Sequence, residues 1–155
     1  MATTGQIAPP PRNGEREAAW QLHVELATRI TVVALPDDSG TLIEALRSVD
    51  AVSLRLAEIA GDYLVPGPTG EPDDVLSIIA EVGDTLDGFT LTWAGPLRAW
   101  HAVRAGQDMA GHERAWPDAV RMRSDLAAVQ SRLTVLANRL ADIGDFASLV
   151  RGEHA

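Results

Sequence analysis

The stretch that decides the fold runs from Trp116 to Ile143 and reads WPDAVRMRSDLAAVQSRLTVLANRLADI. Its apolar residues recur at steps of three and four: Met122, Leu126, Val129, Leu133, Leu136, Leu140 and Ile143. This spacing places them on one face of an α-helix. Proline is favoured at the first position of a helix. We therefore predict a helix that opens at Trp116-Pro117 and ends near Gly144, followed by a short amphipathic remainder through Val150.

Three further segments show the same periodicity. The first spans residues 14–31, with a short extended piece at 30–33 as an alternative because all four of its residues are β-branched. The second starts at Thr41, whose spacing from Glu44 is that of a capping box, and is predicted to end at Gly61 and the loop 66–70. The third follows Asp73-Asp74 and continues to about residue 103.

The third segment contains Gly95-Pro96, and proline removes a backbone donor and crowds the preceding turn of a helix. We expect this helix to be kinked or broken there. Four amphipathic helices joined by short loops bury their apolar faces best against one another. The predicted fold is all-α, an antiparallel four-helix bundle. The expected organisation is a flexible tail at 1–13, a single helical-bundle domain at 14–150 and a flexible tail at 151–155.

The composition excludes several kinds of chemistry. All 13 basic residues are arginine and there is no cysteine, so lysine Schiff bases, P-loop lysines and thiol nucleophiles are excluded. None of the four histidines follows a carboxylate by three residues, as the ligands of a di-metal bundle would. We expect His112 and His154 to be solvated. No hydrolase or nucleotide-binding motif occurs, so we predict neither a metal or other cofactor nor enzymatic activity.

Charge is uneven along the chain. The net charge is −9, and residues 36–74 hold nine acidic residues but only two arginines. The predicted acidic partner surface consists of Asp37, Asp38, Glu44, Asp50, Glu58 and Asp62. This balance disfavours binding to nucleic acid or to an anionic membrane. No segment has the signature of a signal peptide or a membrane span, so the cytoplasm is the expected location.

Tryptophan accounts for four of the seven aromatic residues. Trp93 and Trp100 lie seven residues apart on either side of Pro96, with His101 adjacent, and Trp116 stands at the end of a loop. These side chains either fill the core beside an irregular helix or form an exposed interaction patch of Trp93, Trp100, His101 and Trp116. Of the four tryptophans, Trp116 is the one that we expect to be most exposed.

Several short strings resemble those of a group of small, uncharacterised helical proteins of actinobacteria. They are Arg16-Glu17-Ala18-Ala19-Trp20, Glu25-Leu26-Ala27-Thr28-Arg29-Ile30, Leu97-Arg98-Ala99-Trp100-His101 and Trp116-Pro117. The resemblance covers most of residues 14–145, and the chain departs from the group at Ala51-Val52, where the others carry an aromatic residue. It implies a non-catalytic partner of an effector associated with conflict or defence genes, and it transfers no catalytic residue.

The leading functional hypothesis is a helical module that binds another protein, and self-association into a homo-oligomer is a further option. One alternative is an acidic antitoxin or immunity protein that covers a basic partner with its acidic surface. A second alternative is a helical enzyme or small-ligand sensor with a pocket near Trp93, Trp100 and His101.

Overall fold

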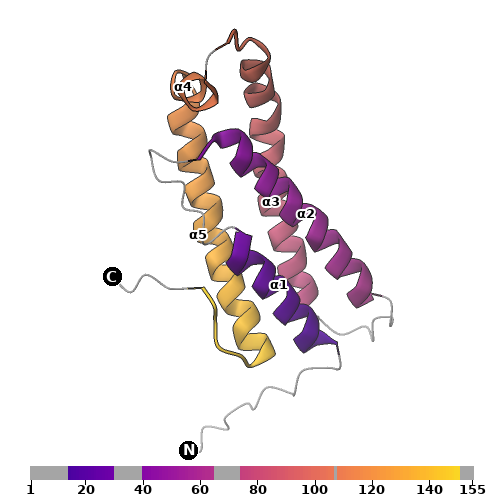
Figure 1. Ribbon diagram of the computed structural model, residues 1–155. Coiled ribbons are helices and arrows are strands. Elements are labelled where there is room, and N and C mark those ends of the chain that lie inside the picture. The colour runs from indigo at the N-terminus through magenta and orange to yellow at the C-terminus, as the bar shows by residue number, and fades with distance from the viewer. Residues whose placement is uncertain (1–13, 30–39, 65–73, 107, 151–155) are drawn as a thin grey trace, which may run out of the picture.

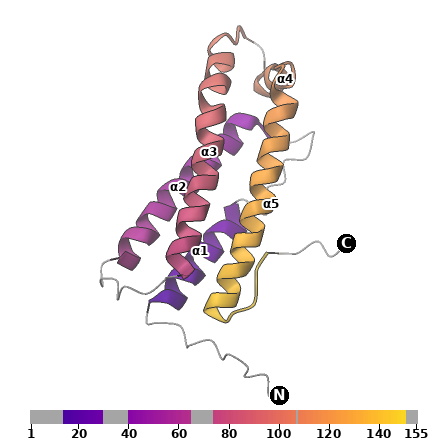
Figure 2. The ribbon, with the colours of Figure 1, turned by 180° about the vertical axis from the view of Figure 1, so that it is seen from behind.

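The computed structural model describes residues 14–29, 40–64, 74–106 and 108–150, and all regular secondary structure in these ranges is helical. The helices are α1 (Glu15–Arg29), α2 (Leu42–Leu64), α3 (Asp74–Ala102), α4 (Met109–Arg114) and α5 (Ala119–Gly144). Four of them are long and lie side by side, whereas α4 sits at the end of the molecule where α3 stops and α5 begins (Figures 1 and 2). The all-α prediction is confirmed. Both predicted tails and the extended piece predicted at 30–33 lie outside the described residues.

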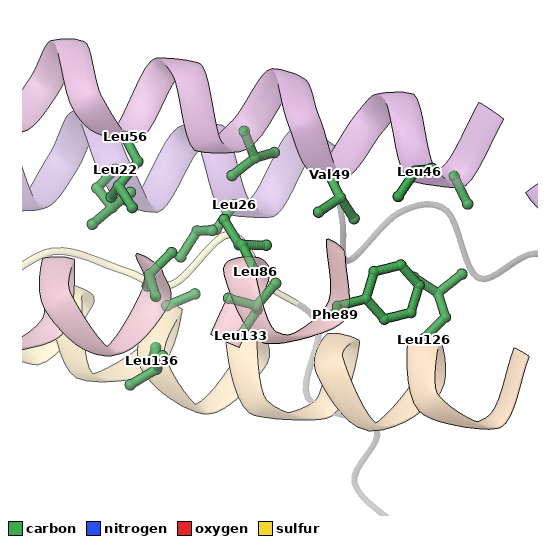
Figure 3. Packing of buried hydrophobic residues seen from close by; sticks show 14 of the residues in the cluster. Leu22, Leu26, Leu46, Val49, Leu56, Leu86, Phe89, Leu126, Leu133 and Leu136 are labelled. Carbon is green, nitrogen blue, oxygen red and sulfur yellow. The ribbon is translucent and has the colours of Figure 1, made fainter. Parts of the chain in front are cut away.

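The apolar stripes of the long helices meet in one core. Helix α1 packs against α2 and α5, and α3 packs against the same two helices. Figure 3 shows leucines from all four helices converging, among them Leu22, Leu56, Leu86 and Leu136. Each such side chain stabilises the fold by about 1.5–3 kcal/mol when it is fully removed from water. The periodicity therefore identified the buried faces of the long helices, except at the end of the third stripe, where Val103 is 68% exposed.

The start of α2 carries the predicted capping box. The Thr41 N–H donates to Glu44 Oε2 at 3.1 Å, and the Glu44 N–H donates to Thr41 Oγ1 at 3.3 Å. The helix passes Gly61 and ends at Leu64, between the two predicted stop signals, Gly61 and the loop 66–70. An added Cβ at Gly61 would meet no other atom within 4 Å, and Tyr63, two residues later, packs partly buried against the core. This contact favours continuation of the helix past a glycine, which costs about 1 kcal/mol relative to alanine.

Helix α3 continues through Pro96, so of the two alternatives predicted near Gly95-Pro96, a kink or a break, the break is excluded. Both residues lie on the exposed face of the helix. Proline has no N–H to donate to the carbonyl of Thr92, four residues earlier. Because Thr92 is exposed as well, water can donate to this carbonyl instead. On the opposite face, Trp93 and Leu97 are buried and hold the helix in the core.

The last long helix begins at Ala119, three residues after the predicted start at Trp116. The preceding residues are used differently, because Met109–Arg114 form the short helix α4 that the sequence patterns did not predict. Asp108 caps α4 by accepting a hydrogen bond from the Gly111 N–H at 2.8 Å. Six residues are too few to show an apolar stripe, and an isolated helix of this length is unstable without tertiary contacts.

The amphipathic helical remainder predicted up to Val150 is also wrong. Helix α5 ends at Gly144, and Asp145 takes a left-handed conformation with φ of 52°. The Phe146 N–H then donates to the Ala141 carbonyl at 3.1 Å, which completes the hydrogen-bond pattern of a helix C-terminus. A Cβ on Gly144 would overlap the Phe146 ring, so this reversal of the chain requires glycine there.

The segment after the reversal, residues 145–150, folds back on α1 through His23. The buried His23 ring lies 2.8 Å (Nδ1) from the Ala137 carbonyl and accepts the Leu149 N–H at Nε2 (2.9 Å). Since a carbonyl only accepts, Nδ1 carries the proton and the imidazole is neutral. Phe146 packs edge-on against Trp20, with ring centroids 5.0 Å apart. This segment is therefore a structural part of the fold.

None of the described helices combines the length and the apolar character needed to cross a membrane.

Candidate functional site

The structure separates the four residues of the predicted aromatic patch into two groups. Trp93 and Trp116 are 3% and 6% exposed, and their rings meet edge to face at 5.9 Å. The Trp93 Nε1–H donates to Asp125 Oδ2 at 3.0 Å, which satisfies the polar atom of this buried ring. The expectation that Trp116 is the most exposed tryptophan is wrong, because α4 turns the chain so that its ring enters the core. Trp20 is the exposed tryptophan instead.

Trp100 and His101 lie at the end of α3 and contact α4. The Trp100 Nε1–H donates to the His112 carbonyl at 2.9 Å, and the His112 Nε2–H donates to the Trp100 carbonyl at 2.8 Å. The two rings stack with centroids 4.8 Å apart. His112 is only 5% exposed, so the expectation that it is solvated is wrong. His154 lies outside the described residues.

Glu113 is a buried carboxylate at the centre of this region, with 1% of its surface exposed. It accepts hydrogen bonds from the backbone N–H groups of Leu42 and Ile43, the first two residues of α2, the latter at 3.0 Å. His101 Nε2 lies 2.8 Å from the same carboxylate and donates to it. An anion at a helix N-terminus is stabilised by the unpaired N–H groups and by the helix dipole. Glu113 therefore joins α2, α3 and α4 at one point.

A shallow pocket of about 280 Å³ opens beside this junction. It is lined by Ile43, Arg47, Arg98, His101, Arg104 and Met109. We call this set of residues the arginine pocket. Its cationic lining is unexpected in a chain with a net charge of −9. The sequence hypothesis placed a pocket near Trp93, Trp100 and His101, and of these residues only His101 lines it.

Of the predicted acidic partner surface, Glu44, Asp50 and Glu58 have partners within the protein. Glu44 belongs to the capping box, and Asp50 lies 3.8 Å from Arg98. Glu58 pairs with Arg55, and this hydrogen bond raises the pKa of the arginine, with a smaller contribution from the charge of Asp62. Asp37 and Asp38 lie outside the described residues.

No group of three or more histidine, aspartate or glutamate side chains in the described ranges is arranged to hold a metal ion. The buried His23 and His112 and the partly buried His101 instead form hydrogen bonds to carbonyl, amide and carboxylate groups of the protein. These contacts explain the positions of the histidines as parts of the framework.

Comparison of the chain with protein-family models, with curated proteins and with solved structures found no match in any of the three.

Proposed function

We propose that the protein is a non-catalytic interaction module, an antiparallel four-helix bundle that binds another protein through the end where α3, α4 and the start of α2 meet. The observation that carries this proposal is the arginine pocket, which combines three guanidinium groups with the apolar side chains of Ile43 and Met109. Arginine beside apolar surface is a composition enriched at the energetic centres of protein interfaces.

The surroundings of the pocket favour binding because they are rigid. Glu113 ties the start of α2 to His101, and the paired Trp100 and His112 tie α3 to α4. A surface held in one geometry loses less conformational freedom on association than a flexible one. Met109, the first residue of α4, supplies an apolar side chain to the pocket itself.

The resemblance to helical proteins that accompany bacterial defence genes suggests what the partner is. In this proposal it is an effector encoded with such genes, and the module acts as its accessory subunit.

The proposal is tested by native mass spectrometry of the tagged protein recovered from lysates of its source organism. Met109→Asp introduces a charge in the pocket, and Leu91→Asp is the matched control, because Leu91 is an apolar residue of α3 that is 85% exposed and lies outside the pocket. We expect the wild type and Leu91→Asp to carry the same partner and Met109→Asp to lose it. Recovery of that partner by Met109→Asp, or a bare monomer in every sample, would contradict the proposal.

A further inference from the structure

We propose that the arginine pocket is a binding site for a phosphoryl group. This inference deepens the proposed function, on which it rests, because it names the chemical group that a partner would present at this end of the bundle. The same chemistry exists in two sources, a phosphorylated side chain and a free phosphate compound.

Five of the six lining residues come from two rows, and the sixth, Met109, begins α4. Ile43 and Arg47 are four residues apart on the first turns of α2, so they share one face. Arg98 and His101 lie near the end of α3, and Arg104 follows two residues after the helix, at the same step of three. The Arg104 N–H donates to the His101 carbonyl at 3.2 Å, and this tight final turn keeps residues three apart on the same side.

The acidic groups of this region do not line the pocket. Glu113 lies behind it and uses its oxygens on α2 and on His101. Asp50 approaches Arg98 at 3.8 Å, near the limit for an ion pair. Among the described residues, Arg47 and Arg104 form no ion pair, and both are exposed. Two guanidinium groups are therefore free to bind an anion, and the third has one long ionic contact.

The number of cations favours a phosphoryl group over a carboxylate. A carboxylate carries a single negative charge and is satisfied by one guanidinium fork. A phosphate monoester carries about −1.5 to −2 charges near neutral pH and has three acceptor oxygens, so it can engage several arginines together. The pocket volume of about 280 Å³ suits a phosphate group together with a small part of the molecule that carries it.

The test is a titration of the purified full-length protein followed by ¹H–¹⁵N NMR, including the Nε–H signals of arginine. The probes are inorganic phosphate, free phosphoserine and acetate. We expect both phosphates to shift signals of residues 43–47 and 98–104, and we expect acetate to bind about tenfold more weakly or worse. Phosphoserine binding more tightly than inorganic phosphate identifies a phosphorylated side chain as the source, whereas equal affinity identifies a free phosphate compound.

The variants are Arg47→Gln and Arg104→Gln, with Arg114→Gln as the matched control, because Arg114 is an exposed arginine of α4 outside the pocket. Each pocket variant should weaken phosphate binding about tenfold, and the control should leave it unchanged. Far-UV circular dichroism verifies that each variant is folded.

The absence of shifts with phosphate would overturn the inference. Equal binding of acetate, or an equal loss in Arg114→Gln, would do so as well. Because no partner is needed, the outcome is separable from the proposed function. A pocket that does not bind phosphate, while Met109→Asp still abolishes partner capture, refutes the phosphoryl site alone.

Discussion

Replacing Glu113 by alanine should destabilise the fold far more than the replacement of an ordinary surface acid. The change removes the shared acceptor of the Leu42 N–H, the Ile43 N–H and His101 Nε2. Leaving the buried Leu42 N–H unpaired costs about 1–3 kcal/mol. Loss of the anion that caps α2 adds about 1 kcal/mol. The expected loss in the free energy of unfolding is about 2–4 kcal/mol, the sum of these two effects.

Urea denaturation followed by circular dichroism measures this loss, and the melting temperature should fall by about 2–4 °C for each kcal/mol. The matched control is Glu44→Ala, which removes an exposed acid from the N-terminus of the same helix. The control should lose about 0.5–1 kcal/mol, as expected for the loss of an exposed capping contact. Equal losses in the two variants would refute the role of Glu113 as the junction of three helices.

Three further substitutions test other parts of the fold. Gly144→Ala should displace the Phe146 ring and lower the free energy of unfolding by about 1–3 kcal/mol, measured by urea denaturation. His23→Phe should free the Leu149 amide, whose hydrogen exchange should accelerate, because the ring no longer accepts its N–H. Trp116→Ala should cost about 3–5 kcal/mol, as expected for a buried ring, and its thermal melting should shift accordingly.

Each of these substitutions has an outcome that contradicts its prediction. Unchanged stability of Gly144→Ala would mean that the segment after α5 does not fold back as described. Unchanged exchange at Leu149 in His23→Phe would show that the imidazole does not hold this segment. A Trp116→Ala protein as stable as Trp20→Ala, in which the truncated ring is exposed, would place Trp116 at the surface.

The sequence sufficed to predict the long helices and their buried faces, because an apolar stripe over several turns is a local pattern. Helix ends were predicted less well where tertiary contacts decide them. Pro96 did not break α3, since it lies on the face where water can replace the missing donor. Gly61 did not end α2, since Tyr63, two residues later, still packs against the core.

The candidate site was harder to predict, because its residues are distant in the sequence. Glu113 contacts backbone groups about 70 residues away, and no local spacing reveals such a contact. The rows that form the arginine pocket show helical spacing, but their meeting depends on the start of α2 lying beside the end of α3. Helix α4 is what buries Trp116 and His112, and its six residues are too short to produce a periodic signal.

The most direct measurement is hydrogen–deuterium exchange of the protein alone and in the assembly recovered from its source organism. Residues 43–47 and 98–104 include all lining residues of the arginine pocket except Met109. Their amides should become protected in the assembly. Protection confined to residues 50–62, the part of α2 that carries Asp50, Glu58 and Asp62, would contradict the proposed binding surface. It would favour a partner that covers the acidic side of the protein instead.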